Sequence, residues 1–579
     1  MKRTTIAKVL ASVVPLLGFG VSASSCGSDS STPPPASTAT PTPTATATAT
    51  QTATDEDPPE VQTGERLFLE TRFAQFFFAH SNGAVNQPLA QGDAVVDTSE
   101  TTGPPLPGPF QGTSINCRSC HLVDELQDNA GGGVRSYEDF ARHSPIPARD
   151  GVGGTTTRNS PTMVNATLPR DVPLMLHLDG EFASTEDLVR GTFTGRNLGW
   201  LPTESATAVA HIANVIRNDD GTGELAADYH SLPYRVALQG TDPSIPADLR
   251  LPAEYRIDVE QSTDSQILDA VAKLVTAYTD SLRFSTDAGG EYNGSPYDIF
   301  LEKNDLPRSP AAGESNLAYS QRLLGQINQI SEPIFVTPAD GSFQFHDQPF
   351  QFGATELQGL KVFFSQPSSA TQATHGVGNC VTCHTPPNFS DFRFHNTGAS
   401  QLEYDAIYGN GSFAALQIPA LTERNASFDM YLPASANHPN AAGRFRTQPV
   451  AGQPGFADLG VWSVFANPDI PTPQGALTQI LCAEFNMPSA SCTADALLPL
   501  TVGLFKTPPL RDLGQSGPYF HTGGTDTFEE VINFYISISA MARNSQVRNP
   551  AAELSSIVLD SSDVAPLSSF LMSLNEDYS

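Results

Sequence analysis

Apolar residues recur at intervals of three and four along several stretches of this chain, which is the spacing of an amphipathic helix. Clear examples are residues 208–216 and 265–278. The segments between them are rich in glycine and proline, and few alternate polar and apolar residues as strands do. The pattern predicts a mainly α fold with long loops.

Two apolar runs are preceded by residues that favour a helix start. Ser184 is followed three positions later by Asp187, and Thr527 is followed in the same way by Glu530. A hydroxyl at the N-cap and an acid at the third helical position satisfy backbone N–H groups of the first turn. We therefore expect helices to begin at these two places.

Two pentapeptides of the form Cys-x-x-Cys-His lie far apart, at 117–121 and 380–384. This motif attaches c-type haem: the thiols add to the two vinyl groups of one porphyrin, and the histidine binds the iron. The alternative is a zinc or redox site, but zinc pairs usually lie roughly 15–20 residues apart. The sequence predicts two covalent haem c groups, held by Cys117, Cys120, His121, Cys380, Cys383 and His384.

The same landmarks follow each pentapeptide in the same order, which indicates an internal duplication. The first series comprises 117–121, 160–163, 178–180 and 184–189, and the second 380–384, 507–510, 521–523 and 527–532. We expect two cytochrome c-like haem domains in tandem, at 63–285 and 286–579, with an insertion at about 303–353.

The N-terminus has the features of an export signal. Residues 1–26 combine three basic residues with a short apolar run that ends near Cys26. Cys26 is a candidate for lipidation, and the alternative is ordinary cleavage near Ala23. Residues 27–62 are rich in Thr and Pro and suit a tether. We expect a periplasmic or cell-surface protein that meets the membrane only through a lipid anchor.

The remaining cysteines and the net charge bear on compartment and partners. Cys482 and Cys492 would form a disulfide in an oxidising compartment, the alternative being two buried free thiols. The net charge of −31 argues against a nucleic-acid partner. It suits a small basic electron-donor protein, and equally a solvated acidic exported protein.

Several stretches resemble motifs of the bacterial di-haem cytochrome c peroxidase family, which includes MauG, the enzyme that matures methylamine dehydrogenase. They are 294–298, 359–364, 380–389, 394–398, 505–511 and 518–521, with 158–162 in the first half. The resemblance covers most of 63–240 and 265–579. It implies an oxidoreductase that takes electrons from a cytochrome c or a cupredoxin.

The resemblance points to Tyr535 as second ligand of the C-terminal haem iron. Peroxidases of this family have a methionine at the matching position, whereas MauG has a tyrosine. Met541 is the alternative ligand, but it lies on a different helical face. A packed helix aromatic is the other interpretation of Tyr535.

The duplication predicts an open iron at the first haem. Aligning Leu188 with Val531 places Thr192 opposite His121, and threonine is a poor iron ligand. An iron with a vacant face binds peroxide or oxygen. His143 would close that face if it bound the iron, and otherwise it is a loop residue.

The residues around this open iron depart from the peroxidase pattern. The family's glutamine and glutamate match Leu188 and either Asn197 or Leu198, none of which is a general base. Nearby acids that would substitute are Glu186, Asp187 and Glu204.

The family's bridging tryptophan is also replaced, because Leu178 stands directly before Asp-Gly. Trp200 is a candidate for the first distal pocket, or a core aromatic. The family also holds calcium between its haems, and the matching positions are Asn159, Ser516 and Pro518, whose oxygens suit that ion.

Three functions fit these observations. The first is peroxide reduction at His121 with electrons relayed from the haem at His384. The second is a haem oxygenase that uses dioxygen on an apolar substrate, as rubber oxygenases do with a largely apolar distal pocket. The third is an electron carrier in which both irons are six-coordinate.

Overall fold

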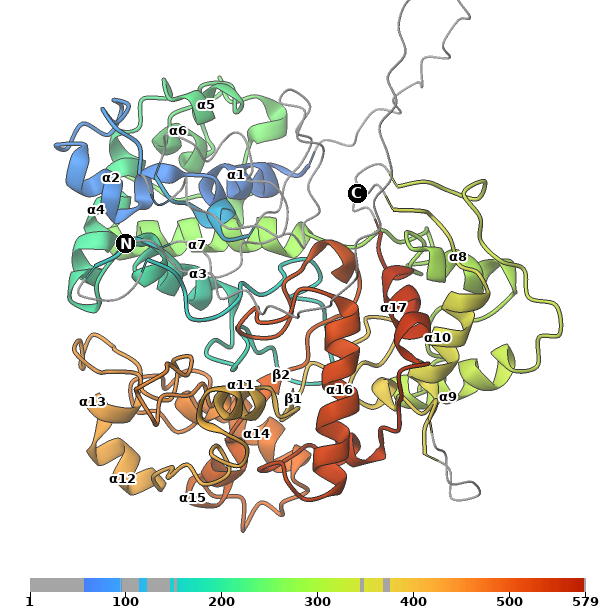
Figure 1. Cartoon of the computed structure of the whole chain (residues 1–579). Helices are drawn as coiled ribbons and strands as arrows, with labels where there is room; N and C mark the ends of the chain where they lie inside the picture. Colours follow the sequence, from blue (N-terminus) through green and yellow to red (C-terminus); the bar gives the residue numbers. More distant parts are fainter. Residues whose placement is uncertain are drawn as a thin grey trace, which may run out of the picture. The chain divides into compact units, whose positions relative to one another are not determined.

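The computed structural model describes residues 57–93, 95, 114–121, 146–149, 154–343, 348–367 and 375–576. The export segment, most of the tether and His143 lie outside these residues. Helices dominate the described part of the chain, and its one sheet pairs β1 (Phe394–His395) antiparallel with β2 (Phe505–Lys506). The predicted mainly α fold is confirmed (Figure 1).

Helices lie at all four places where the sequence predicted them, and further helices surround these. The first half contains α1 (Pro59–Phe68), α2 (Gln75–His80), α3 (Thr185–Phe193), α4 (Ser205–Asn218), α5 (Glu224–Ala227), α6 (Tyr234–Gln239) and α7 (Asp264–Ser281). The second contains α8 (Pro296–Lys303), α9 (Asn316–Ile327), α10 (Ala354–Phe364), α11 (Ala399–Tyr408), α12 (Leu421–Ala426), α13 (Phe428–Tyr431), α14 (Gln474–Glu484), α15 (Ala494–Leu497), α16 (Phe528–Arg543) and α17 (Val564–Met572). Helices α4 and α7 contain the two stretches with helical spacing. Helix α1 begins at Pro59, inside the predicted tether, because proline suits the first helical position.

Both predicted helix starts have the expected caps. The Ser184 hydroxyl accepts a hydrogen bond from the Asp187 N–H at the start of α3, at 3.2 Å. The Thr527 hydroxyl accepts one from the Glu530 N–H at the start of α16, and the Glu530 carboxylate accepts from the Thr527 N–H. These caps fix where the helix begins in each half.

The two halves repeat one helical frame, which supports the duplication. In each half, the helix before the haem motif packs against a later helix: α1 against α7, and α10 against α17 (Figure 1). The helices with capped starts pack on the same partners, α3 on α7 and α16 on α17. Each haem motif begins with a short 3₁₀ turn, Cys117–Ser119 and Cys380–Thr382.

A glycine at the matching contact lets each helix pair approach closely. A Cβ atom on Gly64 of α1 would lie 2.1 Å from the Leu274 carbonyl oxygen of α7. A Cβ atom on Gly359 of α10 would lie 1.9 Å from the Pro566 carbonyl oxygen of α17. Both distances are far below van der Waals contact, so only glycine fits either position.

Buried apolar residues form three clusters. The N-terminal core lies between Val61 and Phe284, close to the predicted domain 63–285. The C-terminal core takes residues from Tyr297–Phe389 and Leu510–Leu574. It includes Tyr319, Leu323 and Ile327 of α9, so the segment predicted as an insertion at 303–353 packs into this core.

A third core was not predicted from the sequence. It combines Met175 with buried residues between Phe394 and Leu504. The Cys482–Cys492 disulfide beside it confirms that predicted pairing. Among the described residues, no helix has both the length and the apolar character needed to cross a membrane.

Candidate haem sites

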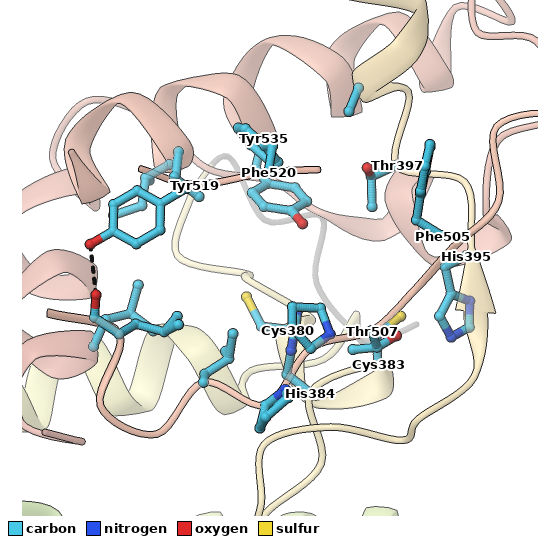
Figure 2. A pocket seen from close by; sticks show the side chains of 18 of the residues that line it. Cys380, Cys383, His384, His395, Thr397, Phe505, Thr507, Tyr519, Phe520 and Tyr535 are labelled. Atoms are coloured by element: carbon cyan, nitrogen blue, oxygen red, sulfur yellow. Dashed lines mark hydrogen bonds between the residues drawn. The ribbon is translucent and has the colours of Figure 1, made fainter. Parts of the chain in front are cut away.

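A cavity in the second half brings the predicted haem residues together. Cys380, Cys383 and His384 line it on one side, and Tyr535 of α16 lines it on the other (Figure 2). Most of the remaining wall is apolar, and it includes Phe363, Leu510, Phe528, Val531, Ile532, Leu567 and Leu571. An apolar cavity with thiols and imidazole at one edge fits a covalently attached porphyrin.

Hydrogen bonding fixes the ring of His384. Its Nδ1 lies 2.9 Å from the Phe389 carbonyl oxygen, and a nitrogen that donates to a carbonyl carries the ring proton. Burial lowers the pKa of the ring, which favours the neutral form. Nε2 is then the basic nitrogen available to a metal, and the backbone holds the ring in place.

Tyr535 projects into the cavity from α16, with its hydroxyl directed toward the side that carries His384 (Figure 2). Burial raises the pKa of this phenol, so it remains protonated unless a cation compensates. Tyr519 differs, because its hydroxyl donates to the Leu513 carbonyl at 2.8 Å (Figure 2). Met541, the alternative ligand, packs against the C-terminal core.

The first haem motif has corresponding surroundings. Burial raises the pKa of the Cys117 thiol to about 12, and burial raises the pKa of the Cys380 thiol equally. Burial, and secondly the charge of His177, lower the pKa of His121 to about 4. The Pro161 carbonyl opposes this lowering of the pKa of His121, and the Pro508 carbonyl opposes that of His384; the duplication makes these two prolines equivalent.

The residues proposed for the open face of the first haem lie in different settings. Thr192 is half-buried on α3, and Leu188 lies one turn before it. Leu198 belongs to the N-terminal core, whereas Asn197 is exposed. The open iron stays a prediction.

The acids considered as proton-transfer groups differ in availability. Glu186 and Asp187 are exposed in the first turn of α3. Both carboxylate oxygens of Glu204 accept from Arg149, at 2.6 and 2.9 Å, and this pairing lowers the pKa of Glu204. Of the three, Glu204 is therefore engaged in an ion pair.

Trp200 lies in the N-terminal core with 1% of its surface exposed. Its indole N–H donates to the Phe73 carbonyl at 3.1 Å, and its ring contacts Phe78 and His211. This is the arrangement of a core aromatic, and its distal role stays a prediction.

Leu178 lies between the two sites. It lines the second cavity, while its neighbour His177 acts electrostatically on His121. The Lys506 N–H also donates to the Leu178 carbonyl at 2.8 Å, which joins the two halves here. The bridging role that the resemblance attaches to this position stays a prediction.

The three predicted calcium positions share one wall of the cavity. Asn159, Ser516 and Pro518 all line it. Asn159 Nδ2 donates to the Pro518 carbonyl at 2.6 Å, while Asn159 Oδ1 is buried without a hydrogen-bond partner among the described residues. A calcium ion would need Asn159 Oδ1, and not Nδ2, on the side of the Pro518 carbonyl oxygen. Rotating the Asn159 side-chain amide by 180° exchanges the two atoms. The calcium site stays a prediction.

Two functional candidates on the cavity wall were missed from the sequence. His395 bonds the Asp391 carboxylate at 2.8 Å; burial opposes its charge, but Asp391 holds the pKa of His395 well above its usual range. Lys506 extends from the neighbouring strand β2. Both belong to stretches that resemble family motifs, which was the available signal.

Comparison with known proteins gives one match in sequence. No family model matches the chain. Over 76 residues the chain is 37% identical to cytochrome-c peroxidase IdrP2 of Pseudomonas sp. (strain SCT), a match that covers 13% of this chain and 18% of that relative. The match thus spans less than a fifth of the relative's length.

Two solved structures are similar over 90% of this chain. A MauG-like protein associated with microbial copper homeostasis is 16% identical, with 91% of its chain covered and a TM-score of 0.40. The diheme peroxidase BthA from Burkholderia thailandensis E264 is 14% identical, with 86% covered and a TM-score of 0.41. The chain is thus similar to a cytochrome-c peroxidase over these 76 residues, and it also carries two Cys-x-x-Cys-His motifs.

Proposed function

We propose that this chain is an exported di-haem c-type oxidoreductase that reduces hydrogen peroxide. Its N-terminal haem, bound at His121, has an open face, and its C-terminal haem, bound at His384, relays electrons. The observation that carries the proposal is the apolar cavity in which Tyr535 faces Cys380, Cys383 and His384. Haem c supplies a one-electron redox centre when bound there.

In this proposal, the residues of the C-terminal site hold the haem and exclude water. Cys380 and Cys383 anchor it, and His384 offers Nε2 while Phe389 fixes the ring. Tyr535, which lines the same cavity, would offer its phenolate oxygen to the iron, because a ferric ion would offset the effect of burial that raises the pKa of the phenol. A hard anionic ligand favours the oxidised iron and lowers its reduction potential.

The N-terminal site differs at the matching position. Thr192 is a poor ligand, so a small oxidant has room to bind opposite His121. Burial keeps the His121 ring neutral, which is the form that binds iron. Leu178 offers no aromatic ring for electron transfer between the sites, so we propose direct transfer from haem to haem.

Export and partners complete the proposal. The N-terminal signal and the Thr/Pro-rich tether suit a periplasmic or cell-surface protein, with Cys26 as the lipid anchor. The Cys482–Cys492 disulfide fits an oxidising compartment. The net charge of −31 suits a basic cytochrome c or cupredoxin as electron donor.

Rapid mixing tests the reaction. The reduced protein is mixed without oxygen with stoichiometric hydrogen peroxide, and haem oxidation is followed by absorbance, with reduced cytochrome c present in a second series. We expect rapid oxidation and continued consumption of the donor. Haem oxidation by dioxygen but not by peroxide would favour the oxygenase function. Two low-spin haems that react with neither oxidant would favour the electron-carrier function.

A pair of tyrosine variants tests the proposed ligand. Tyr535→Phe removes the hydroxyl from the haem cavity, and we expect the optical and EPR spectra of the C-terminal haem to change and its potential to rise. Tyr519→Phe is the matched control, because Tyr519 lines the same cavity but its hydroxyl bonds Leu513. Equal spectra for Tyr535→Phe and the wild type would disprove the ligand assignment.

A further inference from the structure

Lys506 is a cation on the cavity wall with no carboxylate partner among the described residues. It lies in β2, and its ammonium group donates to the Met175 carbonyl at 3.1 Å. Burial is the largest influence on its pKa, which falls to about 7. A buried ammonium is costly unless an anion compensates it.

A second cation lies close to Lys506. The charge of Arg170 lowers the pKa of Lys506 further. Arg170 bonds the Ala166 and Leu168 carbonyls, but its Nη1 is buried without a hydrogen-bond partner among the described residues. Burial, and then the charge of Arg283, lower the pKa of Arg170 to about 10. The positive charges of Lys506 and Arg170 therefore repel each other.

The nearest carboxylate, Asp179, is shared with two arginines. Asp179 lowers the cost of the Lys506 charge, but it pairs with Arg158 at 2.6 Å and with Arg446 at 3.0 Å. Arg158 also binds Asp458, and Arg446 also binds Glu181. When Lys506 and Arg170 are counted with Arg158 and Arg446, four cations face three carboxylates, so the cluster lacks one negative charge.

We propose that Lys506, supported by Arg170, binds a carboxylate of the cofactor, namely a propionate of the haem in the C-terminal cavity. Lys506 lines that cavity, and a propionate is the anionic group that a porphyrin brings into it. A charge-assisted hydrogen bond between ammonium and carboxylate offsets the burial of both. The inference rests on the proposed haem site and does not depend on peroxide turnover.

Redox titration of the purified holoprotein tests this role. Lys506→Met removes the cation and leaves the propionate charge uncompensated, which favours the oxidised haem. We expect the ratio of reduced to oxidised C-terminal haem at a fixed potential to fall about tenfold, a shift of about 59 mV for one electron. Lys506→Arg keeps the charge and should keep the potential near that of the wild type.

Lys273→Met is the matched control, since Lys273 also bonds a backbone carbonyl, that of Glu254, but does not line the cavity. It should leave the potential unchanged. Resonance Raman spectra identify the anion: the propionate bending band should shift in Lys506→Met and return in Lys506→Arg. If a free anion occupies the site instead, chloride or phosphate will shift the potential of the wild type and the propionate band will stay constant.

Two results would overturn the proposal: an unchanged potential in Lys506→Met, or equal shifts in the methionine and arginine variants. If Lys506→Met does not accumulate, the Raman band and the anion titration of Lys506→Arg and the wild type decide the question. Loss of peroxide turnover with an intact potential and propionate band would refute the proposed function and leave this inference standing.

Discussion

The two halves have the same helical frame but differ at the helix position that we propose faces the haem iron. In each half, a glycine on the helix before the haem motif packs on a later helix, and a capped helix packs on the same partner. The helix position that carries Tyr535 in α16 carries Thr192 in α3. In the proposed function this frame would position a haem in each half, and the side chain at this helix position would decide whether a second ligand is offered.

The halves also place buried ion pairs differently. In the C-terminal half, Arg511 binds Asp298 and Glu576, and all three side chains are at most 1% exposed. In the N-terminal half, two arginines share Asp219: Arg66 is fully buried and Arg72 is more exposed. The C-terminal network brings α8 and the chain end to the loop after β2, so it ties together segments far apart in sequence.

The largest effect is expected from removing Arg511. Arg511→Met leaves the carboxylates of Asp298 and Glu576 buried without their cation, and such losses cost about 3–5 kcal/mol. The denaturation midpoint of the C-terminal core should fall, as followed by its haem absorbance. Arg322→Met is the control: its pair with Glu314 is part-exposed, and we expect a change of about 0.5 kcal/mol or less. Similar midpoints for both variants would show that the buried network does not stabilise this half.

The next effect tests whether the two helix contacts are equivalent. Gly64→Ala and Gly359→Ala each place a methyl group against a backbone oxygen, and overpacking of this kind costs about 3 kcal/mol. We expect similar losses, each in the unfolding transition of its own half.

An exposed helical glycine provides the control for this pair. Gly325 in α9 has no atom within 4 Å of a built Cβ, so Gly325→Ala should stabilise the protein by about 0.5–1 kcal/mol. A large loss of stability in only one of Gly64→Ala and Gly359→Ala would mean that the two helix contacts do not stabilise their halves equally.

Local patterns in the sequence predicted most of the frame. The helical spacing of α4 and α7, the caps at Ser184 and Thr527 and the cysteine pair depend on neighbouring residues, and the structure agrees with each; the haem motifs are equally local, and haem attachment stays a prediction. The third core was missed because it assembles Met175 with residues more than two hundred positions later, a long-range contact that no local spacing encodes.

The same limit applies to the candidate site. Tyr535 was named because the resemblance points to its position; the structure places it on the cavity wall, and its role as a ligand stays a prediction. Lys506 was missed because its significance depends on which charges surround it, and Arg158, Arg446 and Arg170 come from distant segments. The role of Trp200 was left open in the sequence, since a core aromatic and a pocket aromatic look alike there.

The smallest effect concerns how the third core is attached to the N-terminal half. Burial opposes the charge of Asp458, but Arg158 holds the pKa of this carboxyl down, at about 2 instead of 3.8. Because the pKa is lower in the folded state, the stabilisation is complete above about pH 4 and is lost as the pH falls toward 2; it amounts to about 2 kcal/mol. In denaturation experiments from pH 5 to pH 2, the free energy of unfolding of Asp458→Asn should therefore fall less with decreasing pH than that of the wild type. Glu423→Gln, on the exposed face of α12 in the same core, should keep the wild-type curve, and an identical curve for Asp458→Asn would show that the Arg158 contact does not attach the third core.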